Sequence, residues 1–138
     1  MAGFLIAMLS GALMSIQGTF NTGVTKASSV WVAAGFVQLT AFATCLVMWI
    51  INGRPQITGL FTVTPKIALL GGVIGAFITY TVIQAISSLG VAKAEIVIVI
   101  SQIAVAYVIE LLGLFGSEKT VFSWVKVLGI GMSIAGVV

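Results

Sequence analysis

Five apolar segments, each about as long as a bilayer is thick, most constrain what this chain can fold into. A transmembrane helix needs about 20 consecutive, mostly apolar residues. The chain offers such stretches at residues 3–21, 30–51, 67–87, 94–114 and 122–138. Most of the charged residues lie in the connections between them. The pattern predicts an all-α, polytopic membrane protein in which residues 1–138 form a single domain of five transmembrane helices.

The composition excludes several classes of protein. Only 7% of the residues are charged, whereas a soluble domain has about 25%, so the chain cannot cover a water-facing surface. Its six cationic residues are spread over the whole length, which predicts no nucleic-acid partner. There is no histidine, and no nucleophile–base pair, metal-ligand cluster or phosphate-binding loop is visible. We therefore expect no enzyme, no metal and no cofactor.

The tryptophans and the loop charges bear on how the chain lies in the membrane. Trp31 opens the second segment and Trp49 closes it, about 27 Å apart along a helix, and Trp124 opens the fifth, as expected of interfacial aromatic belts. The cationic residues are divided so evenly between the two sides that the positive-inside rule favours a cytoplasmic N-terminus only by a small margin. So small a bias permits dual-topology insertion, which is one route to an antiparallel dimer.

Polar side chains interrupt the first segment. Ser15, Gln17 and Asn21 stand among residues suited to a hydrocarbon environment, where a polar group without a partner costs roughly 1–3 kcal/mol. Helical spacing puts Gln17 and Asn21 on one face and Ser15 beside Gly18 on a stripe of small residues. Either a partner helix satisfies the two amides, or they face a cavity that something else occupies.

Other segments carry further amides and hydroxyls. Tyr80 and Gln84 are spaced as i and i+4 in the third segment, and Ser101 adjoins Gln102 in the fourth. Each amide alone is explained by an interhelical hydrogen bond, worth about 0.6 kcal/mol on average. Taken together, they indicate that three segments direct polar groups toward one region of the membrane.

Two carboxylates lie in the fourth segment. Glu110 is well inside it, and an intramembrane carboxylate is a candidate functional group by default. The alternative is that Glu110 pairs with Lys119, Lys126 or an amide near the helix end. Glu95 lies at the start of the segment, where a carboxylate also complements the helix dipole.

Small residues recur in the fifth segment at Gly129, Ser133 and Gly136. In lipid, such residues let helix backbones approach closely. A terminal helix is free to pair outside its own bundle, so this stripe is a candidate dimer contact, with ordinary packing inside the chain as the alternative.

The order of the motifs resembles that of a known family. The pattern Ser-x-Gln-Gly-x-x-Asn at residues 15–21 is similar to the opening motif of the YdcZ-type proteins. These are a family of unknown function, described as inner-membrane exporters of the drug/metabolite transporter superfamily. Residues 109–116, preceded by Ser-Gln at 101–102, resemble the family's second motif, and residues 89–92 and 127–129 fit as well. The resemblance extends over nearly the whole chain.

The chain also departs from the family pattern. The family usually has aspartate and then histidine where this chain has Glu110-Leu111, and glycine at Ser101. Small multidrug transporters of the same superfamily have a central carboxylate in their first span, roughly where this chain has Gln17. An amide cannot take up a proton, so coupling by a central carboxylate is disfavoured here.

The resemblance implies a half-sized secondary transporter of small molecules, most simply an exporter, in the cell inner (plasma) membrane. Larger members carry two inverted five-helix repeats, so one repeat unit would assemble as an antiparallel homodimer, or as a heterodimer with a homologue, around a substrate site near the midplane. Glu110 and Glu95 would serve ion coupling or gating. The expected partners are the substrate, membrane lipid and the second subunit. The expected substrate-binding residues are Gln17, Asn21, Gln102, Ser15, Ser101, Gln84 and Tyr80.

A different class of function competes with transport. The chain could be a small membrane subunit whose polar residues only mediate helix packing with a partner protein. Both interpretations use the same amides, and they differ in whether those amides contact a solute.

Overall fold

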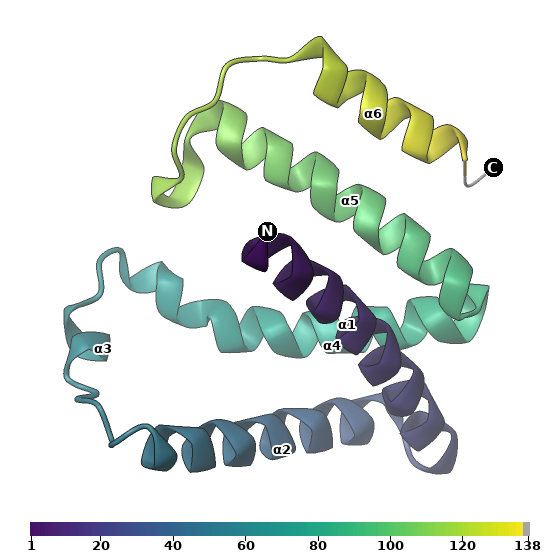
Figure 1. The fold of residues 1–138 in the computed structure, drawn as a ribbon. Coiled ribbons are helices and arrows are strands. Elements are labelled where there is room, and N and C mark those ends of the chain that lie inside the picture. The colour runs from purple at the N-terminus through teal and green to yellow at the C-terminus, as the bar shows by residue number, and fades with distance from the viewer. Residues whose placement is uncertain (137–138) are drawn as a thin grey trace. The chain divides into compact units, whose positions relative to one another are not determined.

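The computed structural model describes residues 1–136, and every regular element in that range is helical (Figure 1). The elements are α1 (Ala2–Ala27), α2 (Val30–Ile51), α3 (Gly59–Thr62), η1 (Lys66–Leu70), α4 (Gly71–Leu89), α5 (Val91–Leu112), η2 (Leu114–Gly116) and α6 (Trp124–Ala135). The predicted all-α class is confirmed.

Within residues 1–136, four helices are long and apolar enough to cross a membrane: α1, α2, the continuous helical stretch Lys66–Leu89 and α5. The fifth predicted segment is helical over the 12 residues of α6, which at 1.5 Å per residue span about 18 Å of a hydrocarbon core about 30 Å thick. Residues 137–138 lie outside the described residues. A fifth crossing, and the inverted-repeat unit that it would complete, stay predictions.

Local sequence signals set the ends of the helices. The Ser29 hydroxyl accepts a hydrogen bond from the Val32 N–H at 3.3 Å and begins α2. Gly90 (φ 80°) separates α4 from α5, and Gly113 (φ 66°) ends α5 in the left-handed conformation that glycine adopts without strain. The first helix runs on to Ala27, beyond the end at Asn21 that hydropathy predicts, because hydropathy marks the apolar part of a helix and not its last hydrogen bond.

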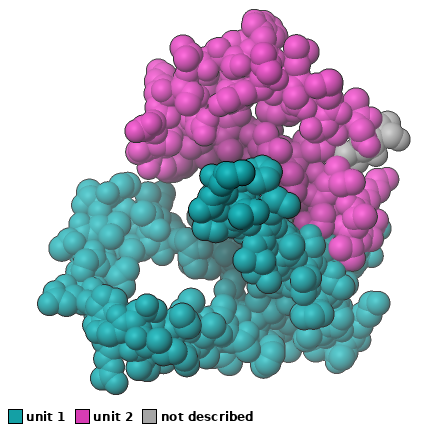
Figure 2. Space-filling view, viewed as in Figure 1, with its two compact units in different colours: residues 1–88 teal, residues 89–138 magenta. Residues whose placement is uncertain are grey.

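The chain forms two compact units, residues 1–88 (unit 1) and 89–138 (unit 2), coloured separately in Figure 2. In unit 1, α1 packs against α2. Gly18, Ala33 and Ala34 are buried there, and such small residues allow close approach of backbones. In unit 2, α5 packs against α6. The single domain predicted for residues 1–138 stays a prediction.

Large apolar side chains remain exposed along every long helix. A surface of this kind is unfavourable in water, since soluble monomers rarely expose contiguous apolar patches beyond a few hundred Å². Lipid is the solvent that such helices require.

Candidate functional site

A groove of about 730 Å³ lies in unit 1, and its walls come from α1 and α2. Its volume is in the range of about 300–1,000 Å³ that is usual for small-molecule sites. None of the residues that line it is charged. The lining consists of Leu9, Ser10, Leu13, Met14, Ile16, Gln17, Phe20, Asn21, Val37, Thr40, Ala41, Thr44 and Cys45.

The groove lies near the middle of both helices. Gln17 lies 11 residues before Ser28 and Thr40 lies 11 residues after Ser29, on the two sides of the connection between α1 and α2. The groove walls, residues 9–21 and 37–45, therefore come from the central parts of the two helices.

Asn21 is the most confined polar side chain of this groove. The residue is only 7% exposed. Its backbone carbonyl accepts from the Thr25 hydroxyl at 2.9 Å, but within residues 1–136 its side-chain amide forms no hydrogen bond. The Asn21 amide therefore faces the groove with its hydrogen-bonding capacity unused, available to a ligand or a partner chain.

The hydroxyls along α1 and α2 behave differently from the amides. Ser15 donates to the Gly11 carbonyl at 3.3 Å, Thr40 to the Val37 carbonyl at 3.0 Å and Thr44 to the Thr40 carbonyl at 2.9 Å. These back-bonds satisfy the hydroxyl protons within their own helices. The Gln17 and Asn21 amides, each with two donor hydrogens and an acceptor oxygen, keep most of the free hydrogen-bonding capacity.

Polar residues of α4 form a second group in unit 1. The Gln84 amide donates to the Tyr80 hydroxyl at 3.4 Å, as the spacing of four residues predicts. The ring of Trp31, from α2, stacks on Tyr80 with centroids 4.5 Å apart. The Gln38 amide reaches from α2 to the Thr79 hydroxyl at 3.5 Å. Gln38 and Trp31 join the polar residues of α4 to α2, a link that intrahelical spacing could not reveal.

The remaining predicted polar residues lie on α5, in unit 2. Ser101 donates its hydroxyl to the Ile98 carbonyl at 2.8 Å, and Gln102 is exposed. Glu95 is half-buried in the second turn of α5. A common site that unites Gln102 with Gln17 and Asn21 stays a prediction.

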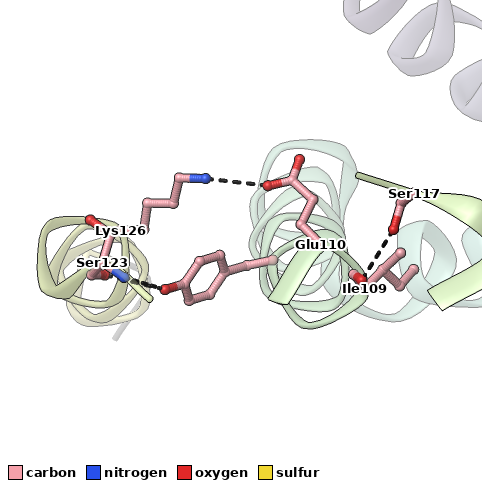
Figure 3. Close-up of polar contacts among 6 residues, drawn as sticks. Ile109, Glu110, Ser117, Ser123 and Lys126 are labelled. Carbon is pink, nitrogen blue, oxygen red and sulfur yellow. Dashed lines mark hydrogen bonds and ion pairs between the residues drawn. The ribbon is translucent and has the colours of Figure 1, made fainter. Parts of the chain in front are cut away.

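Glu110 forms an ion pair with Lys126. The Lys126 Nζ lies 3.2 Å from the Glu110 Oε2, between α5 and α6 (Figure 3). This pairing is one of the alternatives that the sequence left open. Lys126 also lies 5.3 Å from the centroid of the Tyr107 ring, within reach of a cation–π interaction. Tyr107 was not among the predicted site residues, because no local sequence pattern distinguishes it from the other residues of the segment.

Hydrogen bonds fix the α5–α6 connection against the end of α5. The Tyr107 hydroxyl accepts from the Ser123 N–H at 2.7 Å, and Tyr107 is buried. The Thr120 N–H donates to the Glu110 carbonyl at 3.0 Å. The Ser117 hydroxyl donates to the Ile109 carbonyl at 3.2 Å (Figure 3). Glu110 and Lys126 thus face each other across a braced turn.

The predicted dimer stripe is partly turned toward α5. Gly129 and Ser133 line a second cavity, of about 470 Å³, between α5 and α6. Gly136 follows the last residue of α6 as its C-cap. A role for these three residues in a dimer stays a prediction. Across residues 1–136, no three His, Cys, Asp or Glu side chains are grouped so that they could hold a metal ion.

Comparison with known proteins gives one match. A family model described as "Putative inner membrane exporter, YdcZ" matches residues 2–138. No curated protein and no solved structure matches the chain. With its four membrane-length helices, the chain is a multi-pass inner-membrane protein of a transporter family rather than an enzyme family. It belongs to the YdcZ family of inner-membrane exporters.

Proposed function

We propose that this protein is a secondary transporter, working as an exporter, of small uncharged amphiphilic molecules, and that the groove between α1 and α2 forms part of its substrate site. The observation that carries the proposal is the side-chain amide of Asn21, which lines the groove beside Gln17 and forms no hydrogen bond within residues 1–136.

The residues that line the groove indicate which class of substrate would fit it. Apolar side chains from Leu9 to Phe20 would contact an apolar body, and two amides would hydrogen-bond a polar group. A charged solute would find no countercharge among the lining residues, and its transfer from water would be costly. An uncharged molecule with one or two hydrogen-bonding groups fits this lining.

The location of the groove argues for a transport site. Gln17 and Thr40 lie near the centres of α1 and α2, and transporters built from inverted repeats bind substrate near the midplane. In the antiparallel dimer that we propose, Gln102, Ser101, Gln84 and Tyr80 would contribute further contacts. Glu110 or Glu95 would couple or gate transport, because no residue of the groove carries a carboxylate.

Transport by purified protein in liposomes tests the proposal. The solutes are a panel of uncharged amphiphiles that includes chloramphenicol, with tetraphenylphosphonium and tetraphenylborate as a lipophilic cation and anion. We expect protein-dependent movement of uncharged solutes only. Gln17→Leu and Asn21→Leu should each slow it about tenfold, because a lost hydrogen bond costs about 0.5–1.5 kcal/mol and 1.4 kcal/mol is a factor of ten.

The matched control is Gln56→Leu, which removes an exposed amide from the connection after α2 and should leave transport unchanged. The oligomer of each variant is measured by size-exclusion chromatography with light scattering. Loss of the oligomer together with transport would favour the non-transporting subunit. No movement of any solute on the panel would contradict the proposal.

A further inference from the structure

The cavity between α5 and α6 has a charged end and an apolar end. Its only charged lining residues are Glu110, the third-last residue of α5, and Lys126, the third residue of α6. From there the cavity extends along α5 to Ile100, ten residues or about 15 Å away. Apart from Ser133, this inner part is lined by apolar or small side chains. A cavity with this polarity fits an amphiphile better than it fits a water-soluble solute.

Two exposed aromatic residues indicate the depth of the charged end. Phe122 and Trp124 form an edge-to-face pair with centroids 5.1 Å apart, directly before Lys126. Trp124 is 70% exposed, and exposed tryptophans of membrane proteins favour the level of the lipid headgroups. The charged end of the cavity therefore lies where lipid headgroups lie.

The ion pair keeps unused binding capacity. The Lys126 and Glu110 side chains remain 49% and 45% exposed. The ammonium has three donor hydrogens and the carboxylate about four acceptor positions, and the pair uses one of each. Because the pair is neutral overall, a headgroup with a single charge gains one attraction and meets one repulsion. A headgroup with both charges gains two attractions.

We infer that this cavity binds a zwitterionic membrane lipid with a primary ammonium group, phosphatidylethanolamine. Its phosphate contacts Lys126, its ammonium donates to the free Glu110 oxygen, and an acyl chain lies along Ile103 and Ile130. A quaternary ammonium, as in phosphatidylcholine, has no N–H to donate to Glu110. An anionic headgroup, as in phosphatidylglycerol, brings no positive charge to Glu110. The site is separate from the proposed substrate groove, and its test does not depend on transport.

Native mass spectrometry of the full chain in detergent measures the binding. Short-chain phosphatidylethanolamine, phosphatidylcholine and phosphatidylglycerol are offered at equal concentration. We expect phosphatidylethanolamine to bind about tenfold more tightly than the other two, because one charge-assisted hydrogen bond is worth about that factor. Equal binding of the three lipids, or tighter binding of either competitor, would overturn the inference.

Variants show whether the cavity is the binding site. Glu110→Gln should abolish the preference for phosphatidylethanolamine, and Lys126→Met, which removes the phosphate contact, should weaken the binding of all three lipids. The matched controls, Glu118→Gln and Lys119→Met, make the same changes of charge in the connection before α6, outside the cavity lining, and should keep the preference. Controls that lose it to the same extent as the cavity variants would overturn the inference.

Two further experiments test whether lost binding reflects the cavity or misfolding, and whether the cavity binds a lipid or a water-soluble solute. Ala106→Phe fills the cavity and leaves both charges in place, so it should abolish lipid binding while circular dichroism and elution volume stay unchanged. Preserved binding in this variant would overturn the inference. Free glycerophosphoethanolamine, which has the headgroup without acyl chains, should not compete at concentrations where the lipid saturates. Competition as strong as that of the lipid would assign the cavity to a solute instead.

Discussion

Glu110 and Lys126 are sixteen residues apart in the chain, and their side chains meet at 3.2 Å between Oε2 and Nζ. Both are about half exposed. Glu110 lies in the last turn of α5 and Lys126 in the first turn of α6, and the Tyr107 ring underlies the ammonium. The pair joins α5 to α6 with two charges that an approaching ligand can still reach.

This exposure limits what the ion pair adds to stability. Removing it with Glu110→Gln should lower the free energy of unfolding by less than about 1 kcal/mol, as for other exposed pairs. Thermal unfolding in detergent, followed by circular dichroism, measures the change. A double-mutant cycle with Lys126→Met isolates the pair itself, and a coupling energy well above that figure would contradict the interpretation.

Tyr107→Phe should destabilise the protein more than loss of the ion pair. The Tyr107 hydroxyl accepts the Ser123 N–H at 2.7 Å in a buried position, and a buried donor left without a partner costs about 1–3 kcal/mol. The control is Tyr80→Phe, which removes a half-buried hydroxyl with a longer contact of 3.4 Å to Gln84. Equal decreases in melting temperature for the two variants would argue against this role of Tyr107.

Gly113→Ala should weaken the turn that follows α5. Gly113 has φ 66°, and an added Cβ would lie 3.5 Å from the Lys119 Cβ, so the space is adequate and the cost comes from the backbone. A left-handed conformation costs an L-residue roughly 1–2 kcal/mol.

Gly131→Ala is the matched control for this variant. Gly131 lies within α6, where an added Cβ meets nothing within 4 Å, and alanine there should stabilise by about 0.5–1 kcal/mol. The two melting temperatures should thus move in opposite directions. A shift in the same direction would show that backbone conformation does not decide the effect.

Cys45 offers a chemical test of the substrate groove. It is the only cysteine of the chain, is exposed and lines the groove. N-ethylmaleimide, an uncharged thiol reagent, should modify Cys45 and stop transport, and a transported solute should slow the modification. Cys45→Ser should transport normally and resist the reagent. Full transport by the modified protein would mean that substrate does not pass through this groove.

The antiparallel homodimer predicts insertion in both orientations. Alkaline phosphatase and green fluorescent protein, fused in turn after Val138, report the two faces of the membrane and should both be active. Lys26→Gln removes the one cationic residue of the last turn of α1 and should shift the population toward one orientation. Activity of one reporter alone would exclude the antiparallel homodimer and leave a heterodimer or a parallel assembly.

Sequence patterns located the long helices well and the ends of helices less well. The second predicted segment coincides with α2, and the third and fourth predicted segments begin within three residues of the helix starts at Lys66 and Val91. The short helix α3 and the length of α6 were not predicted, because hydropathy reports the solvent of a segment and not its hydrogen bonding. Among the candidate site residues, only pairs within one helix, such as Tyr80 with Gln84, could be paired from spacing alone.

The sequence by itself determined that this chain needs lipid as its solvent, because it holds five apolar segments of about membrane length, and that amides and a few carboxylates interrupt them. The hydrophobicity of a segment is the sum over its own residues, so it can be judged without knowing which helices pack beside it. Only the tertiary structure decided which polar groups find partners. Glu110 meets Lys126 because the turn at Gly113 and the bond from Ser123 to Tyr107 bring α6 back along α5. Asn21 faces the groove with an unpaired side-chain amide, whereas the hydroxyls of Thr40 and Thr44 donate within their own helix.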